Sequence, residues 1–207
     1  MKQKNIKIIS IAIIALIILA GIVVVGIYGF RKELIFDQSQ SIDVYIEQEV
    51  DVSKIKEIVK ENLGNSNNMV QTVEIYKDLV TIRAKEITDE QKNNIVNKIK
   101  ENYEFSQTAE DTTINTVPAT KLIDMYKKYI VPFAISGVLV LIYMAIRYYK
   151  KGILKVIGRT IIFPIFGELF LLSIIALARI PVGRFTPVLV ITMYIASILM
   201  VIKQNEK

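Results

Sequence analysis

Four long runs of apolar residues dominate the hydrophobicity pattern of this chain. They cover residues 8–28, 129–146, 160–178 and 185–202. Each run is close to the roughly 20 residues that an α-helix needs to cross a hydrocarbon core about 30 Å thick. Buried helices of soluble proteins usually retain a polar face, whereas these runs stay apolar on all faces for most of their length. The pattern therefore predicts four membrane-spanning helices.

Between the first and second runs the pattern changes to short elements that each have one apolar face. Period-two alternation predicts strands, and a recurrence every three or four residues predicts helices. In chain order we predict a strand at 41–47, a helix at 52–63 and a hairpin whose two strands are 70–76 and 79–87. A second helix at 88–103 and a last strand at 112–117 follow. Asp51 and Gly64 are placed to begin and end the first helix. Thr88 and Gln91 predict a capping box at the second.

The order β-α-β-β-α-β, with the hairpin turning at Lys77 and Asp78, is the split βαβ arrangement, a sheet with two helices on one face. The predicted fold class is an α-helical membrane protein with four transmembrane helices and an α+β, ferredoxin-like (βαββαβ) extracytoplasmic domain. Residues 1–30 are the cytoplasmic N-terminus and the first membrane helix, and residues 31–128 are the extracytoplasmic domain. Residues 129–207 form a three-helix membrane domain with a cytoplasmic C-terminus. The amphipathic stretch 121–128 either extends the second membrane helix or lies along the membrane surface.

The distribution of charge predicts the orientation of the helices. The chain carries 26 Lys and Arg against 20 Asp and Glu, a net charge of +6. Acidic residues outnumber basic ones over residues 31–128, whereas the connection between the second and third runs contains Arg147, Lys150, Lys151, Lys155 and Arg159. Because cytoplasmic loops are enriched in Lys and Arg, we expect a multi-pass protein of the cell membrane with both termini and this connection in the cytoplasm and residues 31–128 outside. The basic balance then reflects topology and contact with lipids, and no nucleic-acid partner is predicted.

Two further expectations concern the ends of the runs. Arg179 and Arg184 bracket the short connection between the third and fourth runs on the outer side, and they are expected to reach lipid headgroups. The first run is longer than the apolar region of a signal peptide and ends without a small-x-small cleavage site, so it is expected to remain as an uncleaved anchor.

The chain contains neither cysteine nor histidine. Disulfides, thiol nucleophiles, histidine metal ligands and a serine–histidine triad are thereby excluded. A P-loop and a dinucleotide-binding glycine motif are also absent from the sequence. We therefore predict no metal, no cofactor and no enzymatic activity, and we interpret the carboxylates of residues 31–128 as solvated surface groups.

Glu168 is the one charged residue within the third run. An ionised side chain near the middle of a membrane costs at least about 2.5–3.5 kcal/mol, so this carboxyl is expected to be largely protonated unless it has a partner. It can act as a proton carrier, or it can be a neutral acid that hydrogen-bonds a neighbouring helix. The candidate partners for such a bond are Ser136, Thr192, Tyr194 and Ser197.

Small residues and a proline accompany these runs. Pro164 and Gly167 precede Glu168 by one turn or less and are expected to loosen the helix there. Gly137 and Gly158 are expected to allow close packing between helices.

Three stretches of the chain resemble the SecF family, the smaller membrane subunit of the SecD–SecF accessory complex of bacterial protein export. They are the helix, hairpin and helix of residues 52–103, the junction INTVPATKL at 114–122, and YMAIRY at 143–148. Glu168 corresponds to the acidic residue of the family's His-Asp pair in the third span, with Gly167 where histidine is usual. Tyr194 is the residue that remains of the polar motif in the family's fourth span.

The chain also departs from that family. Members normally have six spans, and the glycines after the first span and most polar residues of the fourth are missing here. The resemblance implies an outer domain that contacts emerging preprotein and a proton-relay site at Glu168 and Tyr194, driven by the proton-motive force. It also implies a SecD-like subunit and the translocation channel as partners.

Two other functions fit the same predicted topology. An FtsX-like scaffold has four spans and one outer domain and couples a cytoplasmic ATPase to a cell-wall partner, but its cytoplasmic segment between spans two and three is longer than residues 147–159. A degenerate subunit that only stabilises its complex fits the loss of polar residues in the fourth run.

Overall fold

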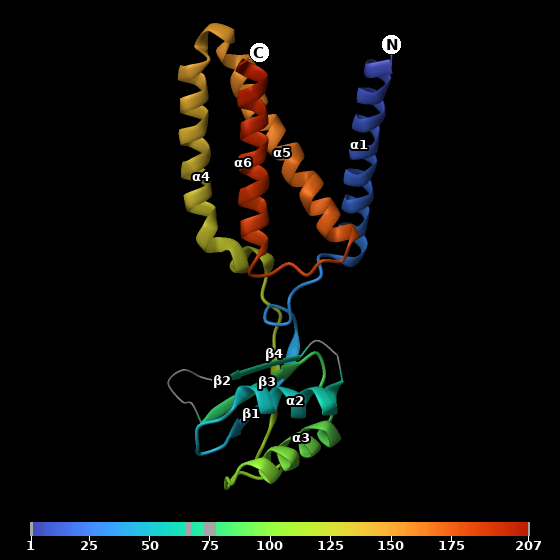
Figure 1. The fold of residues 1–207 in the computed structure, drawn as a ribbon, viewed down its shortest axis with the longest axis vertical. Helices are drawn as coiled ribbons and strands as arrows, with labels where there is room; N and C mark the ends of the chain where they lie inside the picture. Colours follow the sequence, from blue (N-terminus) through green and yellow to red (C-terminus); the bar gives the residue numbers. More distant parts are fainter. Residues whose placement is uncertain (1, 65–67, 73–77, 207) are drawn as a thin grey trace. The chain divides into compact units, whose positions relative to one another are not determined.

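The computed structural model describes residues 2–64, 68–72 and 78–206 of the chain. The protein is mostly helical and divides into two compact units (Figure 1). The helical unit comprises Met1–Glu33 and Leu122–Lys207, and the α+β unit comprises Leu34–Lys121. The α+β unit is thus inserted into the helical unit between its first and second helices.

The helical unit contains four helices that are long and apolar enough to cross a membrane, counted over the described residues. They are α1 (Lys2–Tyr28), α4 (Leu122–Arg147), α5 (Ile153–Leu177) and α6 (Thr186–Glu206). The four apolar helices predicted from the sequence are therefore present, although α4 and α5 begin earlier than their apolar runs. The amphipathic stretch 121–128 belongs to α4 from Leu122 onward, so it extends that helix.

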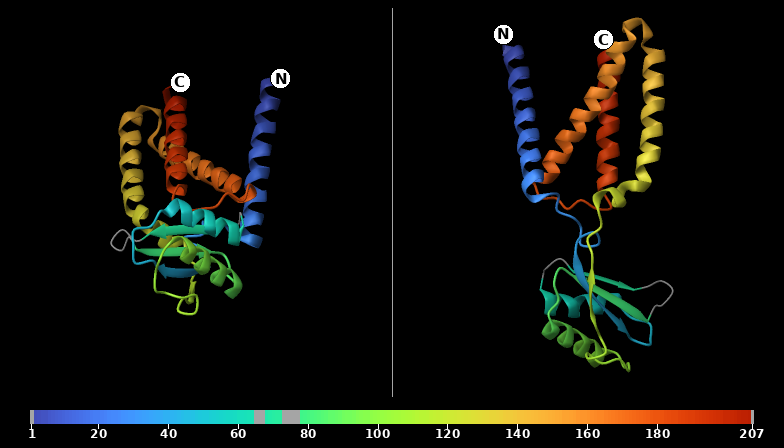
Figure 2. Two further views of the ribbon diagram at one scale, coloured as in Figure 1. Left: turned by 60° about the horizontal axis from the view of Figure 1, so that its bottom comes forward. Right: turned by 180° about the vertical axis from the view of Figure 1, so that it is seen from behind.

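α5 is the central helix of this unit. It runs obliquely from α4 and α6 at its first residues to α1 at its last, and each of the other three helices packs against it (Figures 1 and 2). Between α4 and α5 the chain turns over residues 148–152, with one 3-10 turn, Tyr149–Lys151. Gly152 ends this turn with a φ of 90°, a left-handed conformation that favours glycine.

Two glycines allow α5 to approach its neighbours closely. A Cβ added at Gly21 of α1 would overlap the side chain of Ser173, and one added at Gly167 of α5 would lie 2.5 Å from the hydroxyl of Ser197 in α6. The expectation that Gly137 and Gly158 mark the close approaches is wrong. Gly158 faces open space, and Gly137 has its one such neighbour, the Tyr194 hydroxyl, at 3.9 Å. Which small residue lies in an interface depends on how the helices are rotated, and the sequence does not specify that rotation.

The α+β unit contains a four-stranded sheet and two helices. Its elements are β1 (Ser39–Tyr45), α2 (Val52–Leu63), β2 (Asn68–Thr72), β3 (Leu79–Ala84), α3 (Asp89–Asn102) and β4 (Ile114–Val117). The strand order is β2-β3-β1-β4, and every neighbouring pair is antiparallel. Ile42 lies opposite Ile82 on β3 and opposite Ile114 on β4. Both helices cover the same face of the sheet (Figures 1 and 2).

The core of this unit lies between the sheet and the two helices. Its fully buried members come from the positions that the sequence periodicity marks as apolar, among them Ile42 and Ile82 on strands and Ile55 and Ile99 on helices. Burying one such side chain contributes about 1.5–3 kcal/mol. The alternating and helical patterns therefore specify which face of each element turns inward.

The ends of the two helices follow the predicted capping chemistry. The Asp51 carboxylate accepts a hydrogen bond from the Ser53 amide, and α2 ends at Gly64 with a φ of 70°. The Thr88 hydroxyl and the Gln91 side chain form a reciprocal capping box at α3. Of the predicted hairpin turn, Lys77 lies outside the described residues, while Thr72 and Val80 pair across the two strands.

Candidate functional site

The sequence-predicted site residues Glu168 and Tyr194 line the same cavity, of about 370 Å³. Glu168 lies past the midpoint of α5, and Tyr194 lies on α6. α4 contributes Phe133 and Gly137 to the wall, and α5 also contributes Pro164 one turn before Glu168. Three consecutive helices therefore enclose one carboxyl group.

The carboxyl of Glu168 makes no hydrogen bond within the described chain, although both of its oxygens are enclosed. Of the four predicted partners, Thr192 donates to the Val188 carbonyl of its own helix over 2.8 Å. Ser197 lies against the backbone at Gly167. The structure thus brings Tyr194 and Ser197 into the neighbourhood of Glu168 but forms no hydrogen bond from it to α4 or α6.

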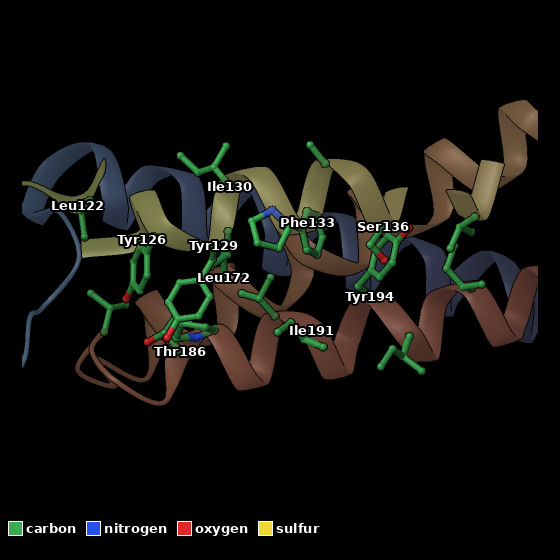
Figure 3. Close-up of a pocket in the computed structure, with 18 of the residues that line it drawn as sticks. Leu122, Tyr126, Tyr129, Ile130, Phe133, Ser136, Leu172, Thr186, Ile191 and Tyr194 are labelled. Atoms are coloured by element: carbon green, nitrogen blue, oxygen red, sulfur yellow. The ribbon is translucent and has the colours of Figure 1, made fainter. Parts of the chain in front are cut away.

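Tyr194 also joins two neighbouring hollows. Its ring meets the Phe133 ring edge-on, with centroids 4.9 Å apart and an interplanar angle of 60°. An apolar groove of about 860 Å³ runs between α4 and α6 (Figure 3). It shares Phe133, Leu172 and Tyr194 with the Glu168 cavity. Ser136, one of the predicted partners of Glu168, lines this groove. The ring pair therefore lines both the acidic cavity and the groove.

Chemically, this arrangement is suited to holding or transferring a proton. A single enclosed carboxyl can take up or release a proton by itself. Nucleophilic catalysis, by contrast, needs a second group that activates the nucleophile. Within the described residues no cluster of acidic side chains could hold a metal ion. The one hydroxyl that α6 contributes to the cavity is that of Tyr194.

The predicted basic residues lie at a different place in the helical unit, around the α4–α5 connection. Arg147 donates to the Tyr143 hydroxyl and lies 3.3 Å from the Glu206 carboxylate, and Arg159 donates to the Asn205 side chain over 3.3 Å. Lys150, Lys151 and Lys155 are exposed. The sequence predicted these cations as a group but missed Asn205 and Glu206, the last two residues of α6.

The connection between α5 and α6 makes contacts that the sequence analysis did not predict. The Val182 amide donates to the Arg31 carbonyl over 2.8 Å, and the Glu33 amide donates to the Val182 carbonyl over 3.0 Å. The Tyr126 hydroxyl donates to the Gly183 carbonyl over 3.3 Å. This connection therefore holds both crossings, the two points where the chain leaves the helical unit for the α+β unit and returns from it.

Arg179 lies beside the first of these crossings. Its guanidinium donates to the Gly29 carbonyl over 2.9 Å and lies 5.7 Å from the centroid of the Tyr28 ring. The guanidinium thus satisfies a backbone carbonyl left free at the end of α1. Contact of Arg179 with lipid headgroups stays a prediction.

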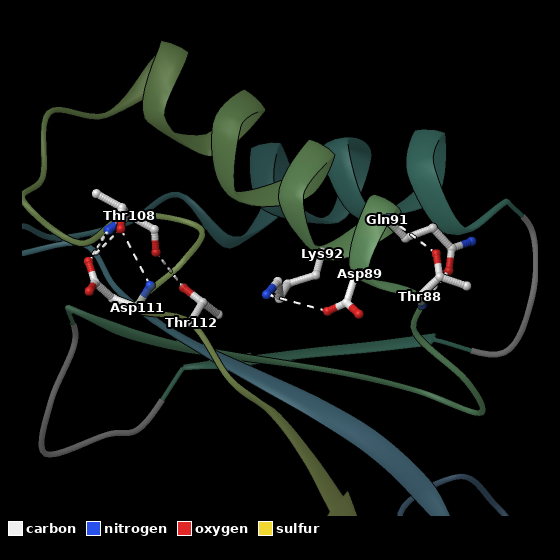
Figure 4. Close-up of polar contacts among 7 residues, drawn as sticks. All are labelled: Thr88, Asp89, Gln91, Lys92, Thr108, Asp111 and Thr112. Atoms are coloured by element: carbon white, nitrogen blue, oxygen red, sulfur yellow. Dashed lines mark hydrogen bonds and ion pairs between the residues drawn. The ribbon is translucent and has the colours of Figure 1, made fainter.

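The polar side chains of the α+β unit form turns and caps. In Figure 4, Thr108, Asp111 and Thr112 bond one another in the loop before β4, and Thr88 and Gln91 cap α3. Lys92 pairs with Asp89 at 3.5 Å within the first turn of the same helix. These contacts are local and shape the backbone, so Asp111 has a structural role beyond the solvated surface group that the sequence suggested.

The chain was also compared with known proteins. No family model matches it, and no curated protein is significantly similar to it.

Proposed function

We propose that this protein is a SecF-like accessory subunit of the preprotein translocase, assisting protein export across the cell membrane. In this proposal the four apolar helices span the membrane, both termini are cytoplasmic, and the α+β unit is an outer, ferredoxin-like domain. The strand order β2-β3-β1-β4, with two helices on one face, supports the ferredoxin-like topology. The basic α4–α5 connection supports the orientation.

The observation that carries the proposal is the pair of crossings held by the α5–α6 connection. The Glu33 amide on one crossing donates to the Val182 carbonyl of this connection, and the Tyr126 hydroxyl on the other crossing donates to the Gly183 carbonyl. The same two helices, α5 and α6, carry Glu168 and Tyr194. A change in how α5 and α6 pack would therefore act on both strands of chain that lead to the α+β unit.

Proton movement at Glu168 is the proposed source of such a change. Loss of its proton places a charge in an apolar cavity, and the packing around the cavity must then supply a partner or admit water. Transfer of one charge through 100 mV supplies about 2.3 kcal/mol, enough to bias two arrangements of the helices. Emerging preprotein would contact the outer domain, and no covalent chemistry is involved.

The partners in this proposal are a SecD-like subunit and the translocation channel. Many large apolar side chains on α1, α4 and α6 are exposed in the isolated chain. A lipid bilayer covers such surfaces, and so do the membrane helices of another subunit. The spans that SecF members normally have beyond four would be replaced by helices of the partner.

One observation favours a second candidate, a subunit that stabilises its complex without proton coupling. Glu168 makes no hydrogen bond within the described chain, so a relay of side chains leading from it is missing. An FtsX-like scaffold is less well supported, because α5 begins at Ile153 and the α4–α5 connection is shorter than the apolar pattern indicated. Co-purification of an ABC-type ATPase, in place of a SecD-like subunit, would favour the scaffold.

Substitution of Glu168 by Gln distinguishes the first two candidates. Glu168→Gln keeps the shape and removes the exchangeable proton, so we expect export to lose its dependence on pH and membrane voltage. Thr192→Val is the matched control, because that hydroxyl bonds within α6 and does not line the cavity. The measurement is the rate of preprotein export in inverted vesicles at different imposed potentials. Unchanged voltage and pH dependence in Glu168→Gln would leave the stabilising subunit as the better proposal.

A further inference from the structure

A cluster of polar side chains lies where α4 and α5 connect and α6 ends, and the proposed function does not use it. We define this end cluster as Arg147, Tyr148, Arg159, Asn205 and Glu206. We propose that the end cluster binds the phosphate group of an anionic ligand, which is either a phospholipid headgroup or phosphate free in solution. The proposal does not depend on a role in export.

Two sets of contacts bring the five side chains to the end of α6. The Arg147 guanidinium lies 5.5 Å from the centroid of the Tyr148 ring and 3.3 Å from the Glu206 carboxylate. Arg159 donates to Asn205 Oδ1 over 3.3 Å, and Asn205 and Glu206 are neighbours on α6. One set of contacts joins Tyr148, Arg147 and Glu206, and a second joins Arg159 and Asn205. The two sets meet at the end of α6, so three helices or their ends contribute to one site.

Apolar packing holds the two inner members in place. Tyr148 is 8% exposed and belongs to a buried cluster with Met144, Val156 and Val201. Asn205 is 2% exposed and lies one helical turn after Val201. Close-packed side chains of this kind have little rotational freedom, so the Tyr148 hydroxyl and the Asn205 amide are held in position before any ligand arrives.

Both inner members have a buried polar atom without a hydrogen-bond partner in the described chain, Tyr148 Oη and Asn205 Nδ2. The orientation of the amide follows from Arg159, which can only donate and therefore faces the amide oxygen. The nitrogen is then the atom left over. Buried donors are normally paired, and two unpaired donors in one cluster indicate a site for an acceptor.

The surrounding charge selects an anionic acceptor. Arg147 and Arg159 face the site directly, and Lys150, Lys151 and Lys155 lie exposed around the same connection, whereas Glu206 is the one acidic member of the end cluster. Guanidinium groups match phosphate geometry, and basic pockets between membrane helices bind phospholipid headgroups. A bound phosphate would compete with Glu206 for Arg147.

Access to the two donors requires a side chain to move, because both atoms are enclosed. Arg147 is suited to this, since its side chain is 48% exposed and lies over the Tyr148 ring. Movement of Arg147 away from Glu206 would uncover the ring and place the guanidinium against the incoming anion. On binding, Arg147 would lose its exposed ion pair with Glu206 and form a more enclosed ion pair with the phosphate.

Two substitutions test the site without removing its packing. Asn205→Asp keeps an acceptor for Arg159 but replaces the free donor by a carboxylate oxygen, and Tyr148→Phe removes the hydroxyl alone. Lys128→Gln is the control, because Lys128 is an exposed cation at the opposite end of α4. Native mass spectrometry of the detergent-purified chain measures retention of phosphatidylglycerol against phosphatidylcholine. We expect preferential retention of phosphatidylglycerol by the wild type and Lys128→Gln, about tenfold weaker retention in Asn205→Asp, and a smaller loss in Tyr148→Phe.

Inorganic phosphate distinguishes the two sources of the ligand. If the ligand is a lipid headgroup, millimolar phosphate leaves phosphatidylglycerol bound. If it is free phosphate, phosphate alone raises the Tm of the wild type and of Lys128→Gln but not of Asn205→Asp. The Tm of each variant in lipid-free detergent shows whether it is folded, and Tyr148→Phe remains informative if Asn205→Asp is not. Equal retention of phosphatidylglycerol in all four proteins, with no rise of Tm in phosphate, would overturn the proposal.

Discussion

At the scale of single residues, Asp111 shows how one side chain shapes a loop. Its carboxylate accepts hydrogen bonds from the Thr108 amide over 3.0 Å and from the Thr108 hydroxyl over 2.5 Å. Gln107, next to Thr108, accepts a hydrogen bond from the Tyr45 amide over 2.7 Å and so joins the loop to the end of β1. The hydrogen bonds from Thr108 lower the pKa of Asp111 below its usual value.

This lowered pKa predicts a stability that depends on pH. A carboxyl whose pKa is lower in the folded state contributes stability above its unfolded pKa, and that contribution is lost as the pH falls through the folded pKa. We therefore expect Asp111→Asn to lower the Tm of the α+β unit at neutral pH, and we expect the difference from wild type to shrink below about pH 4. Thermal unfolding followed by circular dichroism across this range measures it. Glu110→Gln, at the exposed neighbouring residue, is the matched control. A difference between Asp111→Asn and wild type that is constant with pH would contradict the prediction.

At the scale of elements, the contact of α1 with α5 rests on small residues. Ser173 of α5 donates to the Leu169 carbonyl of its own helix over 2.7 Å and approaches the Ile18 carbonyl of α1 at 3.4 Å. Gly21 leaves the space in which this approach occurs. Small residues that let backbones come close are a common basis of helix association in membranes, where apolar burial drives association little.

This contact predicts a position-specific effect along α1. Gly21→Leu would overlap Ser173, and overpacking of this kind costs about 1–3 kcal/mol. Gly26→Leu, on the same helix, enters open space and should leave stability nearly unchanged. We expect a lower Tm for Gly21→Leu alone when the purified chain is heated in detergent. Equal effects of the two substitutions would mean that α1 does not pack on α5 through Gly21.

At the scale of the whole molecule, the chain combines an apolar helical unit with an inserted α+β unit that has its own core. The α5–α6 connection binds both crossings between them through backbone groups of Val182 and Gly183. The cations around the α4–α5 connection lie at the other end of α5. The proposed topology assigns these two ends of the helical unit to opposite sides of the membrane.

The absence of cysteine from the sequence makes this topology directly testable. Asn94→Cys places a thiol on the exposed side of α3, and Lys151→Cys places one in the α4–α5 connection. With the α+β unit outside, a membrane-impermeant maleimide should label Asn94→Cys in intact cells and Lys151→Cys only after the membrane is opened. Labelling of Lys151→Cys in intact cells would reverse the orientation and remove the support it gives to an export subunit.

The features that depend on local pattern could be predicted from the amino-acid sequence. The four apolar helices follow from run length, and the order and inward faces of the α+β elements follow from periods of two and 3.6. The caps at Asp51 and Thr88 follow from side-chain chemistry within a few residues. Glu168 was identified as a candidate site because a charge within an apolar run stands out without any knowledge of its neighbours.

The contacts between residues on different membrane helices, by contrast, could be known only from the structure. The enclosure of Glu168 and Tyr194 in one cavity, the close approaches at Gly21 and Gly167, and the pairing of Arg159 with Asn205 all depend on the rotation and crossing of helices. Nearly every face of an apolar helix is equally apolar, so its sequence contains little information on which face meets a neighbour. The strands of the α+β unit have one apolar face each, and that difference is why their inward faces were predictable and the helix interfaces were not.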